Sequence, residues 1–239
     1  MTVIERLVNK KNELEGRLSN LYHDGSQRRE TLEHKISKIE ELISVYQVNS
    51  PLVDLSEAEQ ILNQQIGFSE QKLKILNKLR IKKEPLIIFL VGPPGVGKTN
   101  FAQILTRALR KKFFSISLGG ISDASVLAGT SENSSGVEVG LLTKALLETK
   151  TSDPLILLDE LDKVTYYGGN SSIHNWLNNI LDPANNQKVL DYYLDVELDF
   201  SQTNFVITAN DAKKSLIIYF QGFQSLSNYP NIIWSKNKR

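Results

Sequence analysis

The segment GPPGVGKT at residues 92–99 has the residue types and spacing of a phosphate-binding loop. It follows an apolar run at residues 86–91 and precedes a helical pattern, the context that the G-x-x-x-x-G-K-T motif requires. Its glycines let the backbone turn tightly and approach an anion, and the loop N–H groups then point at phosphate oxygens. The candidate nucleotide-binding residues are therefore Gly92, Pro93, Pro94, Gly95, Val96, Gly97, Lys98 and Thr99.

Other side chains could complete a phosphoryl-transfer site. Lys98 would neutralise the β- and γ-phosphates, and the hydroxyl of Thr99 would ligate Mg²⁺. The apolar run LILLD ends in Asp159, which would hold the magnesium through water, and Glu160 would orient or deprotonate the attacking water. Asn210 follows another apolar run and would lie beside the γ-phosphate.

Composition excludes several other classes of protein. The 239 residues carry a formal net charge of +1, which gives no support for nucleic-acid binding driven by bulk charge. No cysteine is present, so disulfides and thiolate metal sites are excluded, and the three histidines are scattered. No run of about 18 apolar residues occurs, and the charged N-terminus has no signal-peptide pattern. We therefore expect no membrane span and a cytoplasmic location.

The elements that must position these residues follow from short apolar runs rich in Ile, Val, Leu and Phe. Such runs are typical of parallel strands that are buried on both faces. Helical patterns, for example at residues 99–110 and 141–149, separate most of them, which predicts an α/β domain with a parallel five-stranded sheet. The five expected strands are residues 86–91, 113–118, 155–159, 204–209 and 216–220.

Residues 1–50 predict a helical hairpin or coiled-coil segment. Two apolar stripes with spacings of three and four residues flank the turn signal HDGS, and Lys11 interrupts the first stripe. The stripes could pack against each other or against another subunit. Residues 51–224 would then form the α/β domain and residues 225–239 a short tail. Ser56 and Glu59 have the spacing of a capping box for a helix that follows the linker.

The sequence resembles the AAA+ ATPase module of the Lon protease family over roughly residues 56–224. The more specific motifs are SISLGG, at residues 115–120, and ILDP followed by YLDVELDFS, at residues 180–183 and 193–201. The resemblance implies a P-loop NTPase fold, Walker A at residues 92–99, Walker B at Asp159 and Glu160, and sensor 1 at Asn210. It also implies that Ile66 and Gly67 contact adenine, that ATP and Mg²⁺ are the cofactors, and that subunits form a homohexameric ring.

The sequence departs from the family pattern in its pore loop. Ser134, Ser135 and Gly136 stand where the family has an aromatic–aliphatic–glycine loop, so the aromatic grip on a protein substrate is absent there. Tyr166 and Tyr167 lie near a second pore-loop position and could compensate in part, although such a pair is more often ordinary surface packing. These substitutions put a protein substrate in doubt.

A second departure concerns the arginine finger. The segment that carries it in the family is replaced by residues 211–215, and no arginine occurs between Arg110 and Arg239. Lys213 or Lys214 could substitute, but lysine lacks the planar fork of a guanidinium. No peptidase domain follows in this chain. We therefore expect ATP binding with weak hydrolysis and no proteolysis.

Two further hypotheses remain open from the sequence. The chain could be a nucleotide-dependent interaction protein whose N-terminal helices pair with a full-length Lon-like ATPase. It could also be a decayed remnant, although the intact nucleotide-binding motifs argue mildly against long neutral drift.

Overall fold

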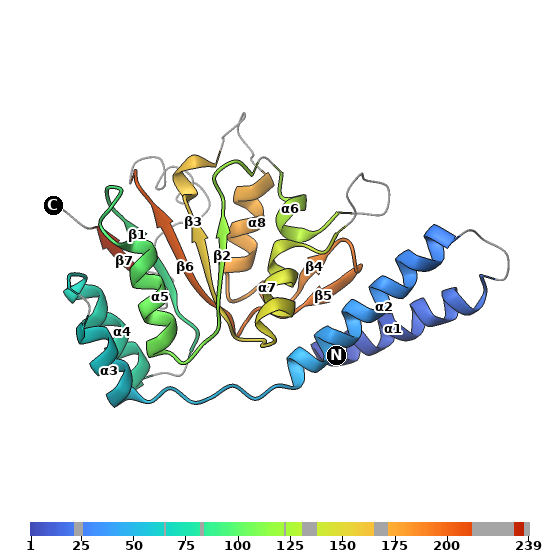
Figure 1. The fold of residues 1–239 in the computed structure, drawn as a ribbon, viewed down its shortest axis with the longest axis horizontal. Coiled ribbons are helices and arrows are strands. Elements are labelled where there is room, and N and C mark those ends of the chain that lie inside the picture. Colours follow the sequence, from blue (N-terminus) through green and yellow to red (C-terminus); the bar gives the residue numbers. More distant parts are fainter. Residues whose placement is uncertain are drawn as a thin grey trace.

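The computed structural model describes residues 1–21, 26–64, 66–81, 84–121, 123–130, 138–164, 172–211 and 232–236. A twisted sheet stands at the centre with helices on both faces, and a helical hairpin extends from one side (Figure 1). Within the described residues, no helix has the length and apolar character that a membrane span needs. The α/β class and the N-terminal hairpin are as the sequence predicts.

Five parallel strands form the main sheet in the order β2-β3-β6-β1-β7. They are β1 (Ile87–Val91), β2 (Phe113–Ser117), β3 (Leu155–Asp159), β6 (Asn204–Ala209) and β7 (Ile232–Lys236). Four of them coincide, to within a residue, with predicted apolar runs. Every residue of β1 and β6 is buried, which explains why these strands read as continuous apolar sequence.

The fifth strand is not the one that the sequence predicts. The predicted strand at residues 216–220 lies outside the described residues. In the structure, β7 pairs with the free side of β1, with Phe89 opposite Trp234. This strand lies within residues 225–239, so the expectation of a tail is corrected for these five residues.

Alternating side chains of the strands enter two separate cores. Ile88 and Leu90 face a core that includes α3 (Leu55–Gln64), α4 (Ser69–Ile81) and α5 (Lys98–Ala108). Ile87 and Phe89 face the other core, which is shared with the elements on the opposite side. Those elements are the N-terminal hairpin, α6 (Ser125–Ala128), α7 (Leu141–Thr149), α8 (Ser172–Leu181), β4 (Val189–Asp191) and β5 (Val196–Leu198).

Helix α3 begins at Leu55, and its N-cap is Asp54 where the sequence predicts Ser56. The carboxylate of Asp54 accepts hydrogen bonds from the backbone N–H groups of Ser56 and Glu57, at 2.9 and 3.1 Å. Ser56 therefore lies inside the helix and the predicted capping box is wrong. Aspartate and serine are both common N-cap residues, so the choice depends on where the linker turns into the helix.

The N-terminal hairpin consists of α1 (Val3–Ser19) and α2 (Ser26–Gln47). Their apolar stripes meet in a buried core with the β4–β5 pair, where Leu7 and Ile39 are fully buried. Lys11, which interrupts the first stripe, forms an ion pair with Glu40 of α2 at 2.7 Å. The two stripes therefore pack within the chain, which is the first of the two predicted alternatives.

Polar contacts fix the hairpin to the β4–β5 pair. The guanidinium of Arg6 donates to the carbonyl oxygens of Glu197 and Gln187, at 2.9 and 3.0 Å. The hydroxyl of Tyr46 donates to the carbonyl oxygen of Asp199 at 2.9 Å and accepts from its N–H at 3.1 Å. The hairpin is thus joined to the α/β domain by both apolar packing and backbone-directed hydrogen bonds.

Candidate nucleotide site

The loop at residues 92–99 connects β1 to α5 at the carboxyl edge of the sheet. The N–H of Gly92 donates to the carbonyl oxygen of Ala209 on β6, at 3.1 Å, so the sheet holds the start of the loop. Gly95 and Gly97 have φ angles of +81° and +87°, a region that favours glycine. These two residues turn the chain so that α5 begins at Lys98 with its N-terminus directed into the loop.

The ammonium group of Lys98 is the centre of the site. It donates to the carbonyl oxygens of Gly92 and Pro93, at 2.7 and 3.1 Å, and to Oδ1 of Asn210, at 2.9 Å. Three acceptors match the three N–H donors of a lysine ammonium. Burial lowers the pKa of Lys98, and the nearby carboxylates of Asp159 and Asp162 oppose that shift.

Asp159 lies where β3 ends, opposite the first turn of α5. Its Oδ2 accepts from the hydroxyl of Thr99 at 3.3 Å, and its Oδ1 accepts from the hydroxyl of Thr208. A threonine hydroxyl beside a carboxylate provides suitable oxygen ligands for Mg²⁺. The described residues contain no cluster of three or more His, Cys, Asp or Glu that could hold a metal. Mg²⁺ usually combines one or two protein oxygens with phosphates and water, and Thr99 and Asp159 could supply those protein oxygens.

Glu160 adopts an unusual backbone conformation, with φ of +63° for a non-glycine residue. Its carboxylate forms an ion pair with Lys163 and lies over Gly119, in the turn after β2. A Cβ atom on Gly119 would be 2.6 Å from Oε2 of Glu160. Such strained residues cluster at functional sites, and the backbone N–H of this one donates to Oδ1 of Asp159 at 3.1 Å.

The sequence reasoning missed three side chains at this edge. Thr208 contacts Asp159, Lys163 contacts Glu160, and Asp162 accepts a hydrogen bond from the backbone N–H of Asn210 at 2.9 Å. Asp162 and Lys163 belong to a short 3₁₀ helix, η1 (Leu161–Lys163). A signal was present in the sequence, because both residues lie within three positions of Glu160 in the predicted acidic pair.

The predicted adenine contacts lie in the turn between α3 and α4. Ile66 is 93% exposed and Gly67 has φ of +85°. The next residue, Phe68, is buried and stacks on Phe101 of α5, with 4.6 Å between ring centroids. This stacking holds the turn beside the first part of α5, one helical turn from Lys98.

Other predicted positions cannot be placed. Ser134, Ser135, Gly136, Tyr166, Tyr167, Lys213 and Lys214 all lie outside the described residues. The pore loop and the substitute for an arginine finger therefore stay predictions.

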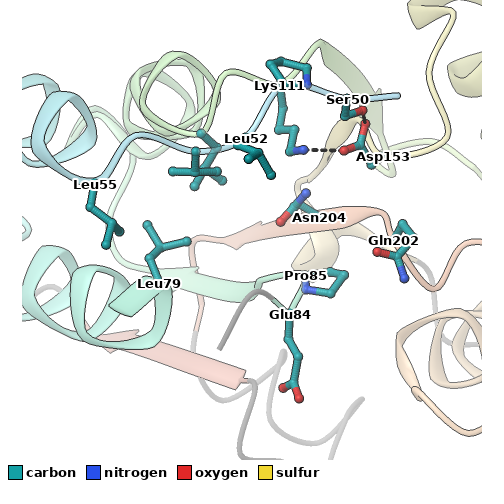
Figure 2. Close-up of a pocket in the computed structure, with 13 residues that line it drawn as sticks. Ser50, Leu52, Leu55, Leu79, Glu84, Pro85, Lys111, Asp153, Gln202 and Asn204 are labelled. Carbon is teal, nitrogen blue, oxygen red and sulfur yellow. Dashed lines mark hydrogen bonds and ion pairs between the residues drawn. The ribbon is translucent and has the colours of Figure 1, made fainter. Parts of the chain in front are cut away.

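A cavity of about 270 Å³ lies elsewhere in the domain (Figure 2). Its lining includes Pro85, Lys111, Asp153 and Asn204, which stand at the starts of β1, β2, β3 and β6. The cavity is thus at the amino edge of the parallel sheet, whereas the loop, Asp159 and Asn210 are at the carboxyl edge. Ser50 and Lys111 both contact the carboxylate of Asp153, so this region anchors the linker.

The fold and the phosphate-binding loop define the class of protein. The chain belongs to the family of ATPases associated with various cellular activities (AAA), whose model matches residues 88–218. Within that family the chain carries a Lon-like AAA module, which confirms the resemblance seen in the sequence.

The relatives that show this are Lon proteases. The Lon protease of Chlamydia trachomatis is 39% identical over 165 residues, which cover 66% of this chain and 20% of the relative. Lon protease 1 of Borreliella burgdorferi is 37% identical over 176 residues, covering 70% and 22%. The mitochondrial Lon protease homolog of Homo sapiens is 39% identical over 166 residues, covering 66% and 17%. The match thus spans about a fifth of the length of these relatives.

Proposed function

We propose that this chain binds ATP with Mg²⁺ at residues 92–99 and hydrolyses it slowly. The observation that carries the proposal is the position of the Lys98 ammonium group. It lies within hydrogen-bond distance of both the loop carbonyls and Asn210, so the loop, the end of β6 and the start of α5 meet at one cation. The hydroxyl of Thr99 donates to the carboxylate of Asp159 at 3.3 Å, which supports the proposal that these two oxygens bind Mg²⁺ together.

Each side chain has a role that its position supports. Lys98 and the loop N–H groups would bind phosphate oxygens, while Thr99 and Asp159 would hold Mg²⁺ directly or through water. Glu160 would orient and deprotonate the attacking water, and Asn210 would fix the γ-phosphate and that water. The bound Mg²⁺ would neutralise charge that develops on the phosphates. Ile66 and Gly67 would contact adenine from the turn that Phe68 holds.

We expect slow hydrolysis because this chain lacks an arginine where the family has its arginine finger. Without an arginine between Arg110 and Arg239, the region of the usual finger has no guanidinium to stabilise the transition state. Loss of such a finger lowers kcat by about 10³- to 10⁵-fold. We therefore expect a kcat well below the ~1 s⁻¹ at the low end of typical enzymes. Assembly of several subunits into a ring remains part of this proposal.

The alternative role as a helical partner for another Lon-like subunit has less support. Its apolar stripes are the surfaces that would pair with a partner, and they are buried within the chain at Leu7, Leu14 and Ile39.

Calorimetric titration of the full chain with Mg²⁺ and ATP, together with a phosphate-release assay, tests the proposal. We expect saturable binding and slow turnover, and Lys98→Ala should weaken binding by at least about 100-fold, or about 2.7 kcal/mol. Lys10→Ala is the matched control, because Lys10 is another largely buried lysine whose partners, Glu13 and Asp195, lie away from the loop.

Two results would contradict the proposal. Absence of nucleotide binding in the folded, unaltered chain would exclude the assigned site. Fast turnover that Lys98→Ala abolishes would show that the arginine is not needed, and that the expected slow rate is wrong.

A further inference from the structure

The backbone of Asn210 is held by a side chain from a different part of the site. β6 ends at Ala209, so Asn210 lies just beyond the strand, and its N–H donates to Oδ1 of Asp162 at 2.9 Å. The side-chain Oδ1 of Asn210 accepts from the Lys98 ammonium, also at 2.9 Å. Asp162 therefore fixes the main chain of the residue whose amide contacts Lys98.

We propose that Asp162 is a positioning residue for ATP hydrolysis. It holds the backbone of Asn210 so that the Asn210 side chain stays within hydrogen-bond distance of the Lys98 ammonium group. This inference rests on the proposed ATPase function and adds a residue to it. Asp162 does not need to contact nucleotide, because its effect passes through the backbone of Asn210.

The three acidic residues in and before η1 contact different partners. Asp162 is therefore not simply a solvated surface charge. Asp159 contacts Thr99 and Thr208, and Glu160 pairs with Lys163 over Gly119. Asp159 reaches the side chain of Thr208 on β6, whereas Asp162 accepts from the backbone N–H of Asn210, just past the end of that strand.

The anchoring of η1 makes this contact well defined. Leu161, which precedes Asp162, is fully buried, and Val164 after the turn is buried as well. The N–H of Val164 donates to the carbonyl oxygen of Leu161 at 3.2 Å, which closes the 3₁₀ turn. The side chain of Asp162 therefore projects from a fixed turn rather than from a loose loop.

The hydrogen bond has a direct consequence for turnover. When its N–H loses the Asp162 acceptor, Asn210 is free to shift relative to Lys98. A displacement of about 1 Å at a catalytic centre can lower the rate by about 100-fold. We expect Asp162→Ala to lower kcat about tenfold and to change the KM for ATP by less than about threefold, because the phosphate-binding loop keeps its own contacts.

A double-mutant cycle on the full chain tests whether Asp162 acts through Asn210. Turnover is measured for Asp162→Ala, Asn210→Ala, the combined variant and Asp162→Asn, with Lys98→Ala as the blank. We expect the combined variant to match Asn210→Ala alone, because Asp162 then has nothing left to position. Asp162→Asn keeps an acceptor oxygen at the same place, so it should retain most of the activity.

Hydrogen exchange supplies a readout that does not depend on activity. The amide of Asn210 should exchange faster in Asp162→Ala and remain protected in Asp162→Asn. Asp182→Ala is the control, since Asp182 accepts from the N–H of Ala184 at 2.9 Å in an exposed turn outside the site.

The outcomes separate this inference from the proposed function. If the unaltered chain shows no turnover that depends on Lys98, the proposed function fails and this inference fails with it. If the unaltered chain turns over ATP, the inference alone is overturned by independent, multiplicative effects of the two alanine variants. It is also overturned by Asp162→Asn being as slow as Asp162→Ala, which would indicate a charge effect.

Discussion

Replacing Gly119 with alanine probes the placement of Glu160. Gly119 lies in the turn after β2, and the N–H of Leu118 donates to the carbonyl oxygen of Asp159 at 2.8 Å, so the turn is tied to the end of β3. The added Cβ would lie 2.6 Å from Oε2 of Glu160 and 3.3 Å from Cδ of Lys163. The substitution therefore removes the space that the Glu160 carboxylate occupies.

The structure sets the size of the expected effect. Ordinary contacts of a Cβ begin near 3.4 Å, so the carboxylate must move by about 0.8 Å. The obstacle is the end of a flexible side chain that is 33% exposed, and its partner Lys163 is 54% exposed. Breaking such an exposed pair costs at most about 1 kcal/mol of stability. Misplacing a catalytic group by about 1 Å can cost about 100-fold in rate, so we expect turnover to fall about 10- to 100-fold, or about 1.4 to 2.7 kcal/mol of barrier.

The assay is single-turnover ATP hydrolysis with enzyme in excess, because the proposed rate is low. Nucleotide affinity is measured by calorimetry and stability by urea unfolding. Glu160→Gln gives the rate without the carboxylate base, and Gly119→Ala should approach it with unchanged affinity. Gly16→Ala is the matched control, since a Cβ there meets nothing within 4 Å.

One result would refute this reasoning. If Glu160→Gln slows hydrolysis while Gly119→Ala leaves it unchanged, the carboxylate does not act from its position over Gly119. A loss of affinity in Gly119→Ala would instead show that the turn after β2 supports nucleotide binding.

Three further predictions concern stability, measured by urea unfolding. Tyr46→Phe should cost about 1 to 2 kcal/mol, because both backbone groups of Asp199 lose their partner, while Tyr192→Phe at an exposed site should cost nothing measurable. Asp191→Asn should cost about 2 to 4 kcal/mol, because one carboxylate accepts from four donors and an amide can serve only part of them. Burial raises the pKa of Asp191 above its ordinary value of 3.8, so between these two pKa values the folded protein binds more protons than the unfolded chain. The free energy of unfolding of the unaltered protein should therefore fall as pH rises from 3.8 through the raised pKa, and its stability advantage over Asp191→Asn should shrink. Gly140→Ala should cost more than about 3 kcal/mol, or prevent folding, because the Cβ would collide with the backbone at the C-terminal end of α6, at Leu127, Ala128 and Gly129.

The phosphate-binding loop could be predicted because its information is local. Glycine at positions 95 and 97 permits positive φ angles, and the lysine that follows begins a helix. The strands β1 and β6 could be predicted for a related reason. Both are buried on two faces, and that burial leaves a continuous apolar run in the sequence.

The strand β7 could not be predicted in the same way. Its pairing partner β1 is more than 140 residues away, and the position of residues 232–236 depends on the open side of β1. Nothing in the short run NIIWSK distinguishes an edge strand from a tail, since strand preference depends on the neighbours that a strand meets.

The hydrogen bonds of the site illustrate the same limit. Sequence reasoning found Lys98, Asp159 and Asn210 as separate motifs, but it could not assign Asp162 to the backbone of Asn210. That contact joins residues 48 positions apart and requires the 3₁₀ turn after β3 to face the end of β6. Residue type predicts the chemistry that a side chain can perform, whereas its partner is set by tertiary structure.

The position of the hairpin bears on the role of the N-terminal helices. Hairpin and linker pack along the amino edge and the β4–β5 side of the domain, away from the loop at residues 92–99 (Figure 1). Burying a leucine or isoleucine side chain contributes about 1.5 to 3 kcal/mol, and Leu7, Ile39 and Leu42 are fully buried here. A partner that pairs with this stripe must therefore replace several kcal/mol of packing. Exposed faces of α1 and α2 could be used without that cost, so any contact that the hairpin makes with another subunit should involve these outer faces.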